Sequence, residues 1–225
     1  MSAVKKIVIF GAGRGSRDVL QLIRQINAKS SVWEILGFVD ADPELKGKLI
    51  DDCLVLGDKY VVPAQETIYG ITGVQIPQLR RKIIENEIEG RGLCLANLVH
   101  PAIELPADLQ MEAGCIIYPG VIIASNVKLG KAVIVNYNTL LGIDLKVGDY
   151  AFIGPGVNIT ASCSIGRECI IGTGAIFMPG VSVGNESIVG LGTKLFISVG
   201  DKKSVVDLPR KIMKDINEAP KKVSW

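Results

Sequence analysis

A six-residue sequence repeat runs without interruption from residue 103 to residue 198. Cut at that period, the segment opens IELPAD, LQMEAG, CIIYPG and closes VSVGNE, SIVGLG, TKLFIS. The third position of each hexad is apolar, and the first is small or β-branched in nearly all of them. The fourth position is often glycine, at Gly130, Gly142, Gly148, Gly154, Gly166, Gly172, Gly184 and Gly190. A short fixed period predicts a parallel β-helix, in which stacked coils share one core because no repeat buries its apolar residue alone.

The hexad also predicts the path of the chain. Three hexads close one triangular coil of about 18 residues. The third-position side chain points into the prism, and the next residue makes the corner, where glycine tolerates positive φ at little steric cost. The first-position side chain also points inward, where the coil is narrow. Alternation in an antiparallel sheet would space apolar residues two apart, but it would not repeat glycine at every sixth place.

Composition excludes several classes of protein. The chain has 225 residues, of which 48% are hydrophobic and 21% charged, so it is globular and not disordered. Its net charge of +2 gives no bias toward nucleic acid. No apolar run is long enough to span a membrane, and the opening MSAVKKIVIFGAG lacks a signal-peptide cleavage site. We expect a cytoplasmic protein with neither nucleic-acid nor membrane partners.

The cysteines indicate packing and not metal or disulfide chemistry. Cys115, Cys163 and Cys169 occupy first positions of hexads, which point inward. Cys53 and Cys94 show no spacing typical of metal ligands, so no metal site is predicted.

The first hundred residues have a different pattern. Apolar residues recur at helical spacing after residue 14, and again from Pro77, where Leu79, Ile83, Ile84 and Ile88 would form an apolar face. β-rich runs at residues 5–10, 34–39, 67–71 and 93–99 precede, separate and follow these helices. Alternating strands and helices predict a small Rossmann-like parallel α/β domain. We therefore divide the chain into a substrate-binding domain (1–100), a β-helix domain (101–200) and a tail (201–225).

A glycine-rich turn joins the first strand to the first helix. It reads Gly11-Ala12-Gly13-Arg14-Gly15, and backbone N–H groups at a helix N-terminus attract phosphate. Asp40, at the end of the second strand, is placed to accept hydrogen bonds from a ribose. The third glycine of the dinucleotide pattern would fall at Ser16, and the sheet is short for a full dinucleotide domain, which disfavours NAD. The alternative is a structural turn with Asp40 as a solvated loop residue.

A half-size α/β domain followed by hexapeptide repeats resembles the bacterial sugar O/N-acyltransferases of the sialic-acid and bacillosamine type, in the hexapeptide-repeat acyltransferase superfamily. The segments that carry the resemblance are IVIFGAGRGSRDVL, ILGFVDADPELKGKLIDDCLVLGD, LRRKI, NLVHPAIELP, the repeats and VVDLPRKIMK. The resemblance implies a left-handed β-helix and a homotrimer. It also implies that acetyl-CoA binds between neighbouring β-helices, and that the small domain holds a free or nucleotide-linked sugar.

The resemblance also assigns site residues. A histidine on the β-helix deprotonates the acceptor in such enzymes, an adjacent acid orients it, and backbone N–H groups hold the developing oxyanion. Residues 133–149, VIVNYNTLLGIDLKVGD, align with the family's base segment without a gap. Asn136 matches a family asparagine and Asp144 matches the orienting acid.

The family's histidines are missing from this chain. The base position is Ile143, and two further histidine positions fall at Phe152 and Gly15. The one histidine, His100, lies in NLVHPAI between the two domains, where it is either a junction residue or a catalytic one. Asp144 is either the base itself or a solvated corner carboxylate. Nearby tyrosines have a reference pKa too high for a base.

By the same resemblance, the pantetheine arm of acetyl-CoA would pass the backbone of Thr160, Ala161, Thr173 and Gly190. The acceptor site would use Gly11, Gly13, Arg14, Gly15 and Asp40. Arg14, where the family has glycine, either pairs with a phosphate or carboxylate or is simply exposed. The basic tail either packs along the β-helix, near the adenine end of the groove, or is disordered.

Two functions from different classes remain open. The first is an acyl-CoA-dependent sugar acyltransferase, with acetyl-CoA as the expected donor, that acts in surface-polysaccharide or glycan biosynthesis. The second is a non-catalytic trimeric relative that binds nucleotide-sugar or acyl-CoA and serves a regulatory or scaffold role. A carbonic anhydrase of the β-helix type is excluded, because it needs three histidine ligands for zinc and the chain has one histidine.

Overall fold

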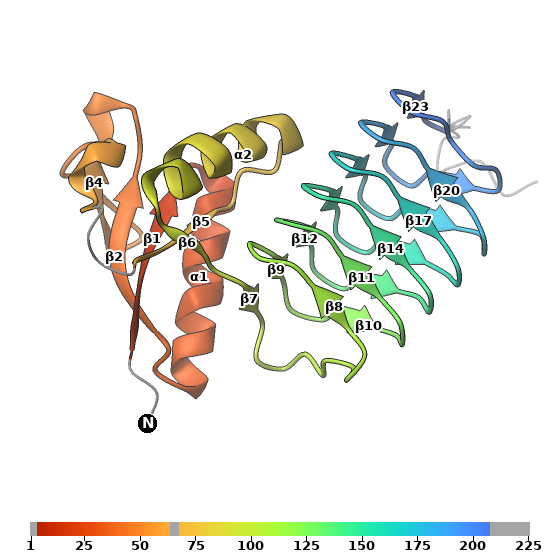
Figure 1. The fold of residues 1–225 in the computed structure, drawn as a ribbon, viewed down its shortest axis with the longest axis horizontal. Coiled ribbons are helices and arrows are strands. Elements are labelled where there is room, and N and C mark those ends of the chain that lie inside the picture. Colours follow the sequence, from red (N-terminus) through yellow and green to blue (C-terminus); the bar gives the residue numbers. More distant parts are fainter. Residues whose placement is uncertain (1–3, 64–67, 208–225) are drawn as a thin grey trace, which may run out of the picture.

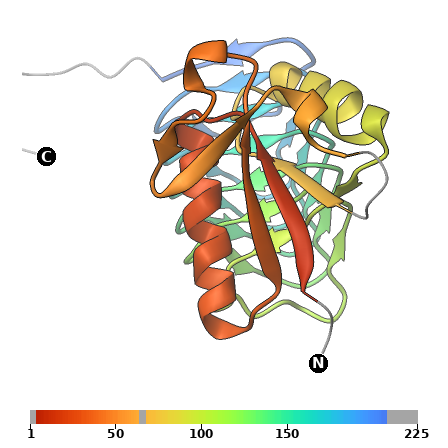
Figure 2. The ribbon, with the colours of Figure 1, turned by 90° about the vertical axis from the view of Figure 1, so that its left-hand side faces the viewer.

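The computed structural model describes residues 4–63 and 68–207. It contains an α/β part and a long β-helix (Figure 1). The α/β part lies at the end of the β-helix that holds its first coils, and Figure 2 views the molecule from that end. Most of the predicted basic tail, residues 208–225, lies outside the described residues.

The α/β part contains a single sheet in which the strand order reverses at β1. The order is β3-β4-β2-β1-β5-β6, and every neighbouring pair except β3 and β4 is parallel. The bounds are β1 (Lys5–Phe10), β2 (Trp33–Val39), β3 (Leu49–Ile50), β4 (Cys53–Gly57), β5 (Ile68–Thr72) and β6 (Cys94–Leu95). The carboxyl ends of β1 and β5 therefore meet at one edge, where a parallel sheet forms a crevice.

Helices cover both faces of this sheet. Helix α1 (Arg14–Lys29) packs on one face, and α2 (Pro77–Ile83) continues into a π-helical turn, η3 (Ile84–Ile88), on the other. The short 3₁₀ turns are η1 (Pro43–Leu45), η2 (Lys59–Val61) and η4 (Glu89–Arg91). Alternation along β1 explains the two layers, because Ile7 and Ile9 pack toward α1 while Val8 and Phe10 pack toward η3.

Three expectations for this part need correction. The run 93–99 is not one strand, because β6 ends at Leu95 and β7 (Leu98–Val99) pairs with β9 of the β-helix. Leu79 does not join the apolar face of α2, since it is 47% exposed. The β3–β4 hairpin, which adds a strand beside β2, was not predicted. Of the predicted strand 67–71, β5 accounts for residues 68–71, and Thr67 lies outside the described residues.

The β-helix consists of three parallel sheets of two-residue strands. One sheet contains β7, β9, β12, β15, β18, β21 and β23; a second contains β10, β13, β16, β19 and β22; the third contains β8, β11, β14, β17 and β20. Each strand pairs with the one directly above it in the next coil, as Ile134 of β12 pairs with Phe152 of β15. This register is the predicted coil of three hexads.

The strands of the β-helix have the following bounds: β7 (Leu98–Val99), β8 (Gln110–Met111), β9 (Ile116–Ile117), β10 (Ile122–Ile123), β11 (Lys128–Leu129), β12 (Ile134–Val135), β13 (Leu140–Leu141), β14 (Lys146–Val147), β15 (Phe152–Ile153), β16 (Asn158–Ile159), β17 (Ser164–Ile165), β18 (Ile170–Ile171), β19 (Ile176–Phe177), β20 (Ser182–Val183), β21 (Ile188–Val189), β22 (Lys194–Leu195) and β23 (Ser204–Val205).

The hexad positions point as predicted, but glycine serves another purpose. First- and third-position side chains fill one continuous core, which includes Cys115, Cys163 and Cys169. Positive φ falls at the sixth position, as at Asp144 (60°) and Glu168 (53°), and not at the fourth-position glycines. Those glycines allow coils to stack closely: a Cβ on Gly148 would lie 2.6 Å from the backbone nitrogen of Arg167. The corner explanation for the repeated glycine was therefore wrong.

All five cysteines are free, and no group of three or more metal-ligating side chains is found among residues 4–63 and 68–207. Within the same ranges, none of the helices is long and apolar enough to cross a bilayer.

Candidate functional site

The turns of the β-helix line up along three edges. We call one the Asp144 edge, formed by the turns at residues 125–126, 143–144, 161–162 and 179–180. The side-chain amide of Asn126 donates a hydrogen bond to Oδ1 of Asp144 over 2.6 Å. Asp144 itself has left-handed backbone geometry, which aspartate tolerates better than most residues. The predicted carboxylate therefore lies on an exposed edge, held by the turn of the preceding coil.

Ile143 lies beside Asp144 in the same turn and is 46% exposed. An apolar side chain is thus presented to solvent at the position where the resemblance implies a histidine. Phe152 is used differently, because it packs against the core shared by α1 and the first coils. Gly15 has a steric reason: a Cβ there would lie 2.1 Å from the carbonyl oxygen of Gly73. A histidine at Gly15 would require the backbone to move.

Asn136 does not join Asp144. Its side chain is buried, and Nδ2 donates to the carbonyl oxygen of Ile153 in the next coil. Strand β13 separates the turn that follows Asn136 from the Asp144 edge. This hydrogen bond ties adjacent coils together, so the structure places Asn136 in the wall of the β-helix.

The four residues expected to line the acetyl-CoA groove flank the sheet of β13, β16, β19 and β22. Thr160 and Ala161 lie on the Asp144 edge, one coil above Ile143, and the amide of Ser162 donates to the carbonyl of Ile143 over 2.8 Å. Thr173 and Gly190 lie at the opposite edge of that sheet. The first pair is therefore next to Asp144, whereas the second pair is a sheet-width away.

The glycine turn forms a small hollow at the carboxyl end of β1 and β5. The hollow has a volume of about 240 Å³ and is lined by Gly13, Arg14, Gly15, Ser16, Gly73, Val74 and Gln75. Helix α1 begins here with Gly13 as its N-cap and has no side-chain cap. Its first N–H groups are thus directed at the hollow without a capping side chain, which suits an anion.

Arg14 lines this hollow and also a second one along α1, together with Arg17, Asp18, Gln21 and Asp51. The guanidinium of Arg17 binds both carboxylate oxygens of Asp51 at 2.8 Å, and this hydrogen bonding lowers the pKa of Asp51. Arg14 forms no hydrogen bond or ion pair within the described part of the chain. It is therefore the cation left available between the two hollows.

Gly11 and Asp40 build the turn and do not line the hollow. Gly11 has a φ of +85°, which only glycine adopts freely. Oδ2 of Asp40 accepts from the amide of Ala12, and Oδ1 accepts from the amide of Asp42. Asp40 thus ties β2 to the glycine turn. It lines a separate hollow with Pro43, Lys46 and Asp58, among others.

The contacts of His100, Tyr118 and Tyr137 favour structural roles over catalytic ones. The Nδ1 atom of His100 accepts from the amide of Ala102 in the turn that opens the β-helix, which favours the junction role. The rings of Tyr118 and Tyr137 stack with centroids 4.8 Å apart. Burial raises the pKa of both hydroxyls, so neither is suited to act as a base.

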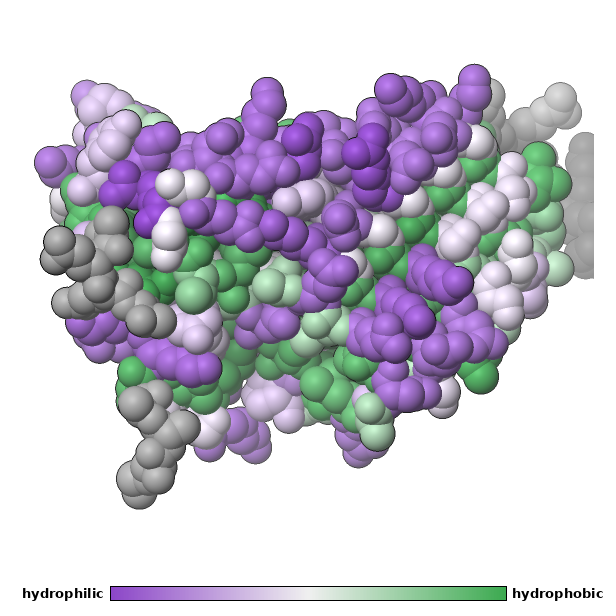
Figure 3. All heavy atoms as spheres, in the orientation of Figure 1, coloured by the Kyte–Doolittle hydropathy of each residue, from purple (hydrophilic) through white to green (hydrophobic). Residues whose placement is uncertain are grey.

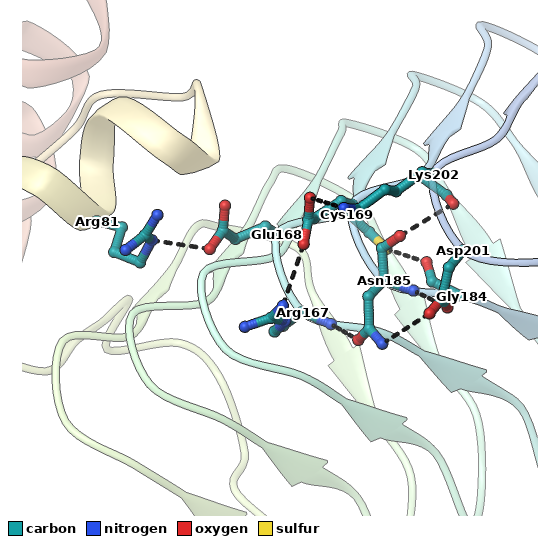
Figure 4. Close-up of polar contacts among 10 residues, drawn as sticks. Arg81, Arg167, Glu168, Cys169, Gly184, Asn185, Asp201 and Lys202 are labelled. Carbon is teal, nitrogen blue, oxygen red and sulfur yellow. Dashed lines mark hydrogen bonds and ion pairs between the residues drawn. The ribbon is translucent and has the colours of Figure 1, made fainter.

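A second edge of the β-helix carries the contact with α2. We call it the docking edge, formed by the turns at residues 131–132, 149–150, 167–168 and 185–186. Figure 3 shows hydrophilic side chains gathered over this upper side of the molecule. Arg81 of α2 points at Glu168, with Nε 2.8 Å from Oε1 (Figure 4). Lys131 pairs with Glu89 at 2.7 Å. These charges neutralise one another across the contact.

Sequence reasoning missed Asn126, Val74, Gln75 and Arg80. Asn126 occupies the same hexad position as Asp144 one coil earlier, so counting along the repeat would have found it. Val74 and Gln75 follow β5 and reach the glycine turn only in the folded protein. Arg80 is buried beneath α2 and is described below.

Comparisons with known proteins support this picture of the fold. The family model "Bacterial transferase hexapeptide (six repeats)" matches residues 144–177. No curated protein sequence matches the chain. Among solved structures, a mutant perosamine N-acetyltransferase from Caulobacter crescentus, in complex with CoA and GDP-perosamine, superimposes with a TM-score of 0.82 and 24% identity, covering 95% of this chain and 99% of that one.

Two further structures are similar over nearly their whole length. The acetyltransferase domain of PglB from Neisseria gonorrhoeae FA1090, in complex with acetyl coenzyme A, has a TM-score of 0.80 and 22% identity, covering 94% of this chain and all (100%) of that domain. WeeI from Acinetobacter baumannii AYE has a TM-score of 0.79 and 24% identity, and the match covers 93% of this chain and 100% of WeeI. The chain shares its whole fold with these proteins.

Proposed function

We propose that this protein is a sugar acetyltransferase that moves an acetyl group from acetyl-CoA to a nucleotide-linked amino sugar. This assignment is supported by the fold that the protein shares with a perosamine N-acetyltransferase bound to CoA and GDP-perosamine and with an acetyltransferase domain bound to acetyl coenzyme A. The single observation that carries it is the pairing of an anion-binding hollow at α1 with an exposed carboxylate, Asp144, on a hexapeptide β-helix. In this proposal the β-helix is left-handed and the α/β part is Rossmann-like, with its strand order reversing at β1.

The acceptor occupies the hollow at the glycine turn. The free N–H groups at the start of α1 hold its phosphates, and Arg14 adds a positive charge beside them. Asp40 acts by fixing the turn through Ala12 and does not bind ribose directly. The small hollow favours a nucleoside diphosphate over a dinucleotide.

Asp144 serves as the base, with Asn126 fixing its orientation. The acceptor amine attacks the thioester carbonyl, Asp144 takes the proton that the amine loses, and the CoA thiolate leaves and is protonated by solvent. A carboxylate is a weak base, but an amine that reaches the site unprotonated needs little help. General-base catalysis contributes about 10²- to 10⁴-fold, whereas proximity contributes about 7–11 kcal/mol.

Acetyl-CoA lies along the sheet of β13, β16, β19 and β22, with Thr160 and Ala161 near the thioester and Thr173 and Gly190 along the pantetheine arm. The outer face of this sheet carries exposed apolar side chains, including Ile122 at 64% and Ile176 at 42%. The same face also carries the exposed Asn158 and Lys194, and a mixture of apolar and polar side chains is ordinary for a subunit interface. They support a homotrimer in which the groove closes between two copies and the acceptor hollow of one copy serves Asp144 of another.

The exposed Ile143 favours one alternative. A chain with an apolar residue at the base position could bind nucleotide sugar or acyl-CoA without turnover and act as a regulatory or scaffold subunit. Incubation of the protein with acetyl-CoA and a panel of nucleotide-linked amino sugars, followed by mass spectrometry of the sugars, separates the two. An acetylated product supports the enzyme, and binding of both ligands without product supports the alternative.

A further inference from the structure

Arg80 of α2 is buried to 1% exposure, and its guanidinium donates to carbonyl oxygens in two separate parts of the fold. Nη1 donates to Val74 at 2.7 Å and to Gln75 at 3.1 Å. Nε donates to Ala132 at 3.1 Å, and Nη2 donates to Tyr150 and Ala151. Because guanidinium has five N–H donors in a fixed plane, it suits this set of five acceptors better than any other side chain.

The first pair of carbonyls belongs to the wall of the hollow at the glycine turn. Val74 and Gln75 line that hollow, and Gly73 beside them touches the backbone of Gly15. The segment after β5 thus lies between the first turn of α1 and the guanidinium of Arg80. A movement of this segment would change the shape of the hollow.

The other carbonyls belong to the docking edge of the β-helix. Ala132 and Tyr150 lie in successive coils, and both have left-handed backbone geometry with φ of 54° and 58°. No carboxylate hydrogen-bonds to Arg80 within the described part of the chain, so its hydrogen-bond acceptors there are backbone carbonyls, and Glu168 acts on its charge only through space. One side chain therefore joins the wall of the hollow to two coils.

We propose that Arg80 is a positioning residue that fixes the acceptor hollow relative to the coils of the β-helix. The inference rests on the proposed function only for the identity of the molecule in the hollow. Arg81 provides the contrast. It pairs with Glu168 on the docking edge but does not touch Val74 or Gln75. The two neighbouring arginines thus have different roles. Arg81 helps to hold α2 against the β-helix, and Arg80 fixes the position of the acceptor hollow.

Amide hydrogen exchange of the purified protein tests this role without any assay of activity. Arg80→Lys keeps a positive charge but has only three donors, so it cannot satisfy both sets of carbonyls. We expect exchange at the Val74 amide, which donates to Oγ1 of Thr72, to become about tenfold faster or more, with exchange in the coils around Ile159 unchanged. Arg81→Ala is the matched control and should leave exchange at the Val74 amide as slow as in the unmodified protein.

Rescue separates positioning from general destabilisation. In Arg80→Ala, added methylguanidinium should occupy the vacated site and slow exchange at the Val74 amide again. Unchanged exchange there in Arg80→Lys, or equal acceleration throughout the protein, would overturn the proposal. If Arg80→Ala does not fold, the comparison of Arg80→Lys with Arg81→Ala still decides whether Arg80 positions the hollow.

Kinetics adds a second readout where the protein is active. Arg80→Lys should raise KM for the sugar acceptor by about tenfold and leave KM for acetyl-CoA unchanged, because the donor groove does not contact Arg80. Equal changes in both constants would contradict a role specific to the hollow. Absence of turnover in the unmodified protein would count against the proposed function, while the exchange result would still decide the role of Arg80.

Discussion

The side-chain amide of Asn126 donates to Oδ1 of Asp144 over 2.6 Å, from the same position of the preceding coil. This leaves Oδ2 of Asp144 without a hydrogen-bond partner among residues 4–63 and 68–207. A carboxylate fixed through one oxygen and open at the other is arranged to accept a proton from a bound acceptor. The hydrogen bond from Asn126 therefore makes Asp144, an exposed residue at a corner of the β-helix, a candidate base.

Replacing Asp144 with asparagine should reduce kcat for acetyl transfer by about 10²- to 10⁴-fold, because the amide cannot accept the proton of the amine. Acetyl-CoA binding, measured by calorimetry, should not change. Asp201→Asn is the matched control, since Asp201 accepts in the same way from the amide of Asn185 on the docking edge, away from Asp144. Full turnover by Asp144→Asn would remove Asp144 from the mechanism.

Replacing Ile143 with histidine should increase turnover. The side chain of Ile143 is exposed on the Asp144 edge, so an imidazole fits there without repacking of the core. With Asp144 beside it, the histidine would supply the stronger base that the family resemblance implies, and kcat should rise by about tenfold or more. Leu49→His, at an exposed position of the β3–β4 hairpin, controls for a general effect of histidine. Equal rates for Ile143→His and the unmodified protein would show that the missing base does not limit the reaction.

Replacing Gly148 with alanine should destabilise the β-helix by about 1–3 kcal/mol, measured by chemical denaturation. The added Cβ would lie 2.6 Å from the backbone nitrogen of Arg167, so adjacent coils would have to separate. Gly200→Ala should have almost no effect, because nothing lies within 4 Å of its Cβ. If both variants were equally stable, close stacking would not explain the repeated glycine.

Buried and exposed cysteines should differ in reactivity. Burial raises the pKa of the Cys115 thiol to about 12, so it remains protonated at pH 8 and does not react as a thiolate. Cys94 is exposed, so iodoacetamide should label Cys94 first and Cys115 only after unfolding, as followed by peptide mass spectrometry. Rapid labelling of Cys115 in the native protein would contradict its placement in the core.

The same shift makes stability depend on pH. The folded pKa of Cys115 lies above its usual value of 9.0, so its contribution is complete below about pH 9 and is lost as pH rises toward 12. Compared with Cys115→Ala, the unmodified protein should lose more stability across that range. A parallel pH dependence of the two proteins would argue against the shift.

The β-helix could be predicted almost completely, because its inward side chains depend only on position within the hexad. The role of the repeated glycines could not be predicted, because their close contacts are with residues of the next coil and depend on how the coils stack. The β3–β4 hairpin escaped notice because its turn uses Asp51 and Asp52 at positive φ, where Asn-Gly or Asp-Gly is the usual signal.

The site was less predictable than the fold. Counting along the repeat would have paired Asn126 with Asp144. The helical spacing of Ile76, Arg80, Ile84 and Ile88 places Arg80 on the same face as two buried isoleucines, so its burial was open to inference. The carbonyl groups that Arg80 binds could not be inferred from the sequence, because Val74, Ala132 and Tyr150 come together only when both parts of the chain have folded. Asn136 was chosen by resemblance alone, and its side chain serves the wall of the β-helix.

The most direct test of the central claim is calorimetric titration of the purified protein with acetyl-CoA. An acetyltransferase whose donor groove lies along β13, β16 and β19 should bind acetyl-CoA with a Kd on the order of micromolar, or about −8 kcal/mol. Ser164→Trp, on the face of β17 away from that groove, should bind equally well, whereas Asn158→Trp, on the face of β16, should not. No detectable heat of binding in the unmodified protein would contradict the account.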